Sequence, residues 1–226
     1  MRRKLAALMT SSIGEKMETA EKMNAGVDTR KKIQLIWAHP RSDSLTARVV
    51  AGIRQEAGAQ GWVVEELDLY RCGFDPVLRE EDEPDWASEQ QVHSAEATAL
   101  AQSLDAVDHI VVVFPVWWYA VPAMLKGYID RVWNYGLVYG DGKRIPASSI
   151  RWVALVGGAQ AKFEAHGWDQ QMKKLLNDGI AAYCGVSDST ITFLYNTIAF
   201  EEATDDIEQH HAALIGQASA LVSGLV

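Results

Sequence analysis

The sequence predicts an α/β protein with a doubly wound sheet of five parallel strands and helices on both faces. Two observations support this prediction. From Ile33 onward, short apolar segments alternate with longer segments of helical periodicity, which is the pattern of repeated β-α units. The apolar segments, of which residues 110–114 are the clearest, show no polar alternation, and this is typical of parallel strands covered on both faces.

The first part of the chain is expected to hold an extension and then the start of the domain. Residues 1–31 are polar and lack the period of a helix or strand, so we treat them as an N-terminal extension of a single domain at 32–226. An apolar segment predicts a strand at 33–38, and helical periodicity predicts a helix at 45–59. The turn at Gln60 and Gly61 then precedes a strand expected at 62–69.

The middle of the chain is expected to supply the central strand and its flanking helices. An alanine-rich stretch predicts a helix at 85–104, before the strand at 110–114. The acidic run at 80–83 is expected to be a solvated loop, because adjacent carboxylates in a flexible run lack the fixed geometry of a metal site. A helix is expected at 122–133, where Pro122 suits the first helical position and apolar residues recur at helical spacing.

The last part of the chain is expected to complete the sheet and cover it. Thr204 is the expected N-cap of the final helix, and Asp205 and Asp206 are favourable charges in its first turn. The remaining elements are expected at 151–156 (strand), 170–183 (helix), 189–194 (strand) and 205–225 (helix).

The composition argues against several classes of protein. The 226 residues include 21 Lys and Arg against 30 Asp and Glu, and no predicted element has a basic stripe, so we expect no binding to nucleic acid. No apolar segment approaches the roughly 20 residues that span a bilayer, so a soluble protein is expected. The two cysteines are too few for a disulfide framework and lack metal-ligand spacing, which favours the cytoplasm and predicts no metal site.

Three consecutive aromatic residues, Trp117, Trp118 and Tyr119, follow the central strand. They lie in a turn between Pro115 and Pro122, at the carboxyl end of that strand, which is where flat ligands bind in open parallel sheets. Large apolar rings are costly to leave in water, so some partner must cover them. Two interpretations stay open, a ligand or a neighbouring helix or subunit.

The first strand also runs into a turn that suits a ligand, in this case a phosphate. His39, Ser42 and Ser44 lie just before the helix at 45–59, whose N-terminus presents free backbone N–H groups. In the simpler interpretation, a serine only caps the helix and His39 is a loop residue. Neither a G-x-G-x-x-G fingerprint nor a Walker loop is present, which argues against a Rossmann dehydrogenase and a nucleotide triphosphatase. A flavin and a flavodoxin-type strand order are favoured instead.

A third candidate segment follows the strand at 151–156. Gly157 and Gly158 allow a flat ring to approach the backbone closely, and nearby amides can stabilise negative charge on it. His166 is a candidate proton donor, although a lone histidine is more often structural or merely exposed. His210 and His211 do not share one helix face, and we expect no site there.

With these motifs together, the chain resembles the flavodoxin-like NAD(P)H dehydrogenase (quinone) family. That family includes the mammalian quinone reductases, bacterial modulator-of-drug-activity proteins and ancillary proteins of potassium-efflux systems. The resemblance covers the chain from about Ile33 nearly to its C-terminus. It rests on Ala38, His39 and Pro40 with Ser44 and Leu45, on Leu67 to Tyr70 with Phe74 to Pro76, on Phe114 through Val132, and on Gly157 and Gly158 with Phe163, His166 and Gly167.

The resemblance implies a homodimer that binds FMN or FAD near the subunit interface. It implies that Phe163 lies toward the substrate, that Trp117 lies toward the substrate or the partner, and that Tyr139 reaches the substrate pocket from the partner subunit. The implied flavin contacts are His39, Ser44 and Leu45 on the phosphate side, Pro115, Val116, Trp118 and Tyr119 along the ring, and Gly157 and Gly158 at its pyrimidine end.

The implied activity is hydride transfer from NAD(P)H through the flavin to a quinone or similar flat acceptor, with both substrates using one pocket in turn. The chain departs from the family at Leu155 and Val156, where hydroxyl residues are frequent, and at Phe163, which replaces a tyrosine that assists hydride transfer. His166 is then the expected proton donor, without help from the aromatic turn. The alternatives are an ancillary subunit of a potassium-efflux transporter at the membrane and an electron carrier without a substrate of its own.

Overall fold

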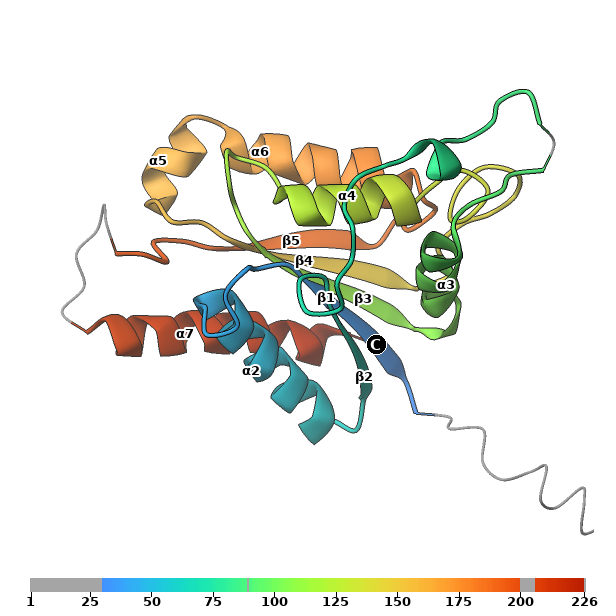
Figure 1. Ribbon diagram of the computed structural model, residues 1–226. Coiled ribbons are helices and arrows are strands. Elements are labelled where there is room, and N and C mark those ends of the chain that lie inside the picture. Colours follow the sequence, from blue (N-terminus) through green and yellow to red (C-terminus); the bar gives the residue numbers. More distant parts are fainter. Residues whose placement is uncertain (1–29, 89, 200–205, 226) are drawn as a thin grey trace, which may run out of the picture. The chain divides into compact units, whose positions relative to one another are not determined.

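The computed structural model describes residues 30–88, 90–199 and 206–225. Within the unit Lys31–Val226, five parallel strands form one sheet in the order β2-β1-β3-β4-β5 (Figure 1). This is the flavodoxin-type order, and it confirms the predicted fold class. The strands are β1 (Lys32–Trp37), β2 (Val63–Asp68), β3 (His109–Pro115), β4 (Ser149–Leu155) and β5 (Ser189–Leu194).

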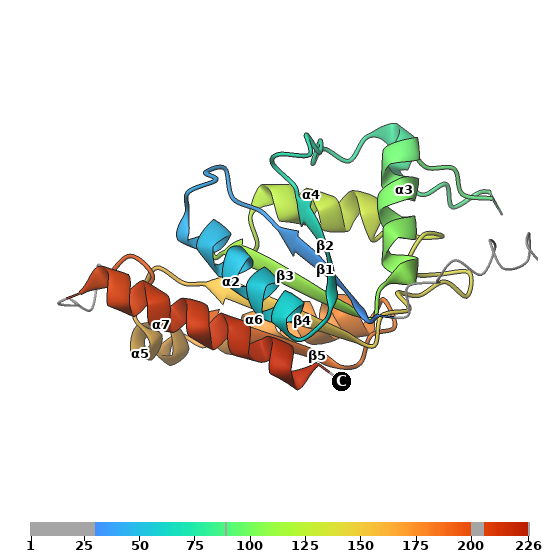
Figure 2. The ribbon, with the colours of Figure 1, turned by 90° about the horizontal axis from the view of Figure 1, so that it is seen from below.

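Helices cover both faces of the sheet. On one face, α2 (Leu45–Ala59) and α7 (Ile207–Ser219) pack against each other and lie in front of the strands in Figure 2. The other face is covered by α3 (Ala95–Ser103), α4 (Ala123–Val132) and α6 (Trp168–Lys173), together with the π-helix η3 (Lys174–Ala182). Three short 3₁₀ segments are η1 (Glu80–Asp82), η2 (Leu104–Ala106) and η4 (Ala220–Gly224).

The central strand β3 explains why the prediction of parallel strands succeeded. All seven of its residues are buried. Val111 and Val113 belong to the core beneath α2 and α7, whereas Val112 and Phe114 belong to the core beneath α3, α4 and α6. Because both faces are dry, every position favours an apolar residue, and the polar alternation of a half-exposed strand is absent.

The helix predicted at 85–104 is shorter than expected, and that prediction was wrong at its start. The helix α3 begins at Ala95, where the Ser94 hydroxyl accepts a hydrogen bond from the Ala97 N–H at 3.2 Å and so acts as N-cap. Before it, Asp85 organises a turn, since its carboxylate accepts from the Ala87 N–H at 2.9 Å.

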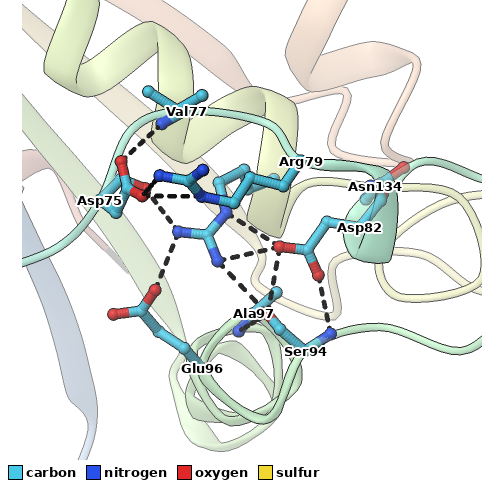
Figure 3. A network of polar contacts seen from close by, with 9 residues as sticks. Asp75, Val77, Arg79, Asp82, Ser94, Glu96, Ala97 and Asn134 are labelled. Atoms are coloured by element: carbon cyan, nitrogen blue, oxygen red, sulfur yellow. Dashed lines mark hydrogen bonds and ion pairs between the residues drawn. The ribbon is translucent and has the colours of Figure 1, made fainter.

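The acidic run at 80–83 is only in part the solvated loop that we expected, since Glu80, Glu81 and Glu83 are exposed but Asp82 is not. Asp82 is fully buried and forms an ion pair with the buried Arg131 of α4 at 2.9 Å. Its carboxylate also accepts from the Ser94 N–H at 2.7 Å (Figure 3), and Arg131 forms a second ion pair with Glu96 at 2.8 Å. Burial alone would raise the pKa of Asp82, but the hydrogen bonds from Ser94 and Arg131 outweigh it and hold that pKa below its ordinary value.

The C-terminal helices differ from the prediction in their boundaries. A short helix, α5 (Gln160–Ala165), was not expected, and α6 begins at Trp168 rather than at 170 before it continues into η3. Asp206 is the N-cap of α7, since its carboxylate accepts from the Gln209 N–H at 3.0 Å, so it is not the first-turn charge that we expected. Thr204 and Asp205 lie outside the described residues. Pro122 is the N-cap residue of α4 rather than its first helical residue.

Two kinds of feature are absent from the residues that the structure describes. No helix in that part of the chain is long and apolar enough to cross a membrane. Nor do three or more His, Cys, Asp or Glu side chains of those residues gather where they could hold a metal ion.

The buried ion pair gives a first prediction. Replacing Arg131 with Met leaves the Asp82 carboxylate buried without its counter-charge, which should lower the free energy of unfolding by roughly 3–5 kcal/mol. Urea denaturation followed by circular dichroism measures the loss. The control is Arg79→Met, because the Arg79–Asp75 pair is exposed and such pairs contribute under about 1 kcal/mol. Equal losses for the two variants would contradict the assigned role of Arg131.

A second prediction concerns acid. A carboxyl group whose folded pKa lies below its unfolded value stabilises the fold above the unfolded value, and this contribution is lost as the pH falls through the folded value. Asp82→Asn should therefore cost most stability near neutral pH, and the difference from the unaltered protein should shrink below about pH 4. Urea denaturation at a series of pH values tests this. A difference that does not change with pH would show that the charge of Asp82 is unimportant.

Candidate functional site

A cavity opens at the carboxyl ends of β3, β4 and β5. Its volume is about 450 Å³, which falls within the range of roughly 300–1,000 Å³ typical of small-molecule sites. Aromatic and glycine residues dominate its wall. The lining residues are Val116, Trp118, Tyr119, Val156, Gly157, Gly158, Ala159, Lys162, Phe163, His166, Trp168 and Ile198.

The aromatic turn after β3 has an unusual backbone. Trp117 and Ala120 exchange both of their backbone hydrogen bonds at 3.1 Å, and between them Trp118 and Tyr119 have φ values of 53° and 60°. These values define a type I′ turn, which is ordinarily formed by Asn and Gly because the left-handed region costs other residues roughly 1–2 kcal/mol each. Trp118 is nevertheless 94% exposed, so burial of its ring does not offset that cost in this structure.

The ring of Tyr119 has a defined place on the cavity wall. It stacks on Trp168 with ring centroids 4.3 Å apart and an angle of 18° between the planes, and it lies 6.1 Å from Phe163. The ring of His166 is parallel to Trp168 within 5°, at 6.5 Å. Trp168 is therefore a shared support for Tyr119 and His166. The sequence pattern did not identify this residue as a site residue.

The glycines after β4 face the loop that follows β5. A Cβ atom on Gly157 would come within 3.3 Å of the Ile198 side chain. The loop is tied to β4 because the Asn196 N–H donates to the Gly158 carbonyl at 2.9 Å and the Thr197 N–H donates to the Val156 carbonyl at 3.1 Å. The absence of a side chain at Gly157 therefore leaves open space between this residue and Ile198 of the loop.

His210 and His211, for which we expected no role, hold the same loop from α7. Their Nε2 atoms lie 3.2 Å from the Asn196 carbonyl and 3.0 Å from the Thr197 carbonyl. A carbonyl oxygen only accepts hydrogen bonds, so both Nε2 atoms donate. Their partners are consecutive residues, so these two adjacent histidines hold the same loop. We did not expect this, because adjacent positions on a helix point in different directions.

The cavity also offers hydrogen-bond donors. The backbone N–H groups of Trp118, Tyr119, Gly157 and Gly158 have no acceptor among the residues that the structure describes. All four residues line the cavity. Such groups can donate to carbonyl oxygens and ring nitrogens at the edge of a flat heteroaromatic ligand.

The turn after β1 lies beside the aromatic turn but outside the cavity wall. The rings of His39 and Trp117 are 6.0 Å apart. Ser44 caps α2, since its Oγ accepts from the Ala47 N–H at 3.2 Å, as the simpler interpretation had it. Leu45 is the first residue of that helix and packs against the core.

The charge of His39 is set by its neighbours. Its Nδ1 accepts from the Arg41 N–H at 3.0 Å. Burial and the positive charges of Arg71 and Arg41 lower the pKa of His39 below its ordinary value, despite its contact with the Arg41 backbone, so a neutral ring with a proton on Nε2 is favoured. Arg71, which the sequence pattern did not identify, donates to the His39 and Pro40 carbonyls and fixes the turn.

The other predicted site residues do not line the cavity. Pro115 is the last residue of β3 and is buried against β4. Trp117 is 41% exposed beside His39. Tyr139 packs against the rings of Tyr135 and Tyr183, at 5.8 Å and 5.2 Å. The structure thus brings together seven of the predicted residues as lining residues, namely Val116, Trp118, Tyr119, Gly157, Gly158, Phe163 and His166.

His166 is exposed, and one of its ring nitrogens is engaged. Nδ1 lies 2.8 Å from the Lys162 carbonyl, so Nδ1 donates. In the neutral ring the remaining nitrogen, Nε2, is therefore an acceptor, and it donates only in the imidazolium form.

Comparison with known proteins agrees with the observed fold. A family model described as flavodoxin-like fold matches residues 31–217. The uncharacterized NAD(P)H oxidoreductase YcaK of Escherichia coli is 47% identical over 199 residues, which are 86% of this chain and 98% of that protein.

Two solved structures share the fold. One is an NAD(P)H:quinone oxidoreductase from Methanothermobacter marburgensis, with a TM-score of 0.75 and 22% identity over 87% of this chain and 96% of that one. The other is an FMN-dependent NADH-azoreductase from Bacillus anthracis in complex with FMN, with a TM-score of 0.64 and 17% identity over 86% and 99%. At these identities the likeness establishes the fold alone. Together with the match over residues 31–217, it shows that this chain belongs to the flavodoxin-like fold family.

Proposed function

We propose that this protein is a flavin-dependent NAD(P)H:quinone oxidoreductase, in which NAD(P)H and a flat acceptor use one cavity in turn. The observation on which this depends is the cavity between the turns after β3 and β4, with aromatic walls and backbone N–H groups that lack an acceptor among the described residues. The 47% identical relative, which is named an NAD(P)H oxidoreductase, supports the class of reaction.

The residues present fit a flavin. A flat ring can lie against Gly157, where the missing Cβ leaves space, and the N–H groups of Trp118 and Tyr119 can donate to its polar edge. The nearby β1 turn suits the phosphate, since His39 presents Nε2–H and α2 presents its N-terminus. The structural relative that contains FMN supports FMN, and FAD has the same ring and first phosphate.

A bound flavin would supply the two-electron carrier between nicotinamide and acceptor. The chain supplies the environment. Trp118, Phe163 and Trp168 offer flat apolar contacts for the two substrates, and the 5% exposure of Phe163 shows that its part of the wall is dry. His166, in its imidazolium form, donates a proton from Nε2 to the oxygen of the acceptor.

We propose further that the protein is a homodimer. Trp118 and Tyr183 are 94% and 69% exposed, and large exposed aromatic residues favour an interface. Tyr183 packs on Tyr139, which supports the proposal that Tyr139 lies at the contact with the partner. The 41% exposure of Trp117 supports the same proposal for its ring.

The experiment that tests the cofactor is the visible absorption spectrum of the purified protein, with mass spectrometry of whatever heat releases from it. We expect a flavin spectrum and the mass of FMN or FAD. Colourless protein that takes up neither flavin would overturn the proposal.

Steady-state kinetics with NADH or NADPH and a quinone should give parallel double-reciprocal lines, whereas intersecting lines would reject a shared cavity. A semiquinone that accumulates in anaerobic titration would favour an electron carrier instead.

A third prediction concerns Gly157. Gly157→Ala places a methyl group 3.3 Å from Ile198 on the side where we place the ring. The methyl group occupies space that we assign to the ring, which should weaken binding by roughly 1–3 kcal/mol. The dissociation constant of FMN, measured by fluorescence titration of the apoprotein, should therefore rise about fivefold to hundredfold. The matched control is Gly58→Ala in α2, where a Cβ meets nothing within 4 Å. Equal effects at the two positions would contradict the placement.

A fourth prediction concerns the strained turn. Trp118→Asn removes an exposed ring and tolerates the left-handed conformation, so the free energy of unfolding should rise by about 1 kcal/mol. Quinone reduction should fall, because a cavity wall is lost. Urea denaturation and initial rates measure the two effects. Trp86→Asn is the control, since Trp86 is exposed but has no positive φ. A less stable Trp118→Asn variant would contradict the inferred strain.

A further inference from the structure

The described residues leave one hydroxyl group at the cavity without a hydrogen-bond partner, that of Tyr119. Tyr119 lines the cavity and is 51% exposed. Nothing in that part of the chain bonds to its hydroxyl group. Tyr195, whose ring also packs near Phe163, lies outside the lining residues and donates to the Glu164 carboxylate at 3.4 Å.

We propose that the Tyr119 hydroxyl group is a hydrogen-bond donor to the acceptor oxygen that becomes negatively charged when the substrate is reduced. This inference rests on the proposed function and assigns a substrate class to the same cavity, namely flat acceptors with an oxygen at the ring edge. In this step Tyr119 keeps its proton. The two electrons and one proton of the hydride reach the acceptor, and the second proton comes from His166, which solvent reprotonates.

The geometry of His166 explains why a second donor is needed. Nδ1 of His166 donates to the Lys162 carbonyl, so Nε2 of the neutral ring can only accept a hydrogen bond. Until that nitrogen is protonated, His166 cannot stabilise a negatively charged oxygen. A phenolic O–H donates whatever the charge of the neighbouring imidazole.

The position of the donor is fixed by packing. Tyr119 stacks on Trp168 at 4.3 Å, and the left-handed backbone of Tyr119 and the paired hydrogen bonds of Trp117 and Ala120 restrict its Cα. Donors that are held in place before the reaction are the effective ones, because little reorganisation is needed when charge develops. Lys162 also lines the cavity, but it is exposed, so water screens its positive charge.

The test compares Tyr119→Phe with Tyr195→Phe, two variants that each lose one hydroxyl group and keep their rings. The first readout is the ionisation of bound 4-nitrophenol, which is followed by its visible absorption in both the apoprotein and the flavin-loaded protein. A hydrogen bond to a charged oxygen should favour the bound anion roughly tenfold or more, so Tyr119→Phe should raise the pKa of the bound phenol by about 1 unit. Tyr195→Phe should leave it unchanged.

The second readout is the kinetics of quinone reduction. Tyr119→Phe should lower kcat roughly tenfold to hundredfold with little change in KM, since the interaction forms mainly as charge develops. Thermal denaturation should show equal stability for both variants. An unchanged nitrophenol ionisation in Tyr119→Phe, or an equal shift in Tyr195→Phe, would overturn the proposal. If the protein binds no flavin but Tyr119→Phe still shifts nitrophenol, the proposed function fails and the hydrogen-bond donor stands.

Discussion

The candidate site depends above all on the parallel register of β3 with β4. Pro115 pairs with Leu155, and the Val116 N–H continues that ladder by donating to the Leu155 carbonyl at 2.8 Å. Because parallel strands end at the same edge, this register places the aromatic turn and the glycine pair opposite each other. The cavity between the two turns follows from that alignment. The parallel register of β1 with β3 in turn brings the β1 turn beside the aromatic turn.

Local chemistry then decides what the cavity can hold. The type I′ turn keeps Trp118 and Tyr119 in a costly conformation, and the loop after β5 is tied down from two sides, by β4 and by His210 and His211 of α7. Hydrogen bonds thus restrict the backbone on both walls of the cavity, which suits a ligand that is itself flat and rigid.

The sequence predicted the strands and the fold class well, because burial on both faces leaves a plain apolar signal in segments such as 110–114. It did not predict the buried ion pair. Asp82 and Arg131 lie 49 residues apart, and only tertiary packing distinguishes this carboxylate from its solvated neighbours. The start of α3 was missed for a related reason, since Ser94 is a cap that composition alone could not separate from the alanine-rich stretch around it.

The sequence predicted lining residues that directly follow a strand. It missed lining residues that come from other parts of the chain. Gly157 and Tyr119 follow strands directly, whereas Trp168 and Ile198 arrive by way of short elements without a readable period. The central claim, that one flat ligand lies between these two turns, is tested most directly by a crystal structure of the flavin-loaded protein. The account predicts the isoalloxazine ring between residues 116–119 and 157–158. A ring bound outside this cavity would contradict it.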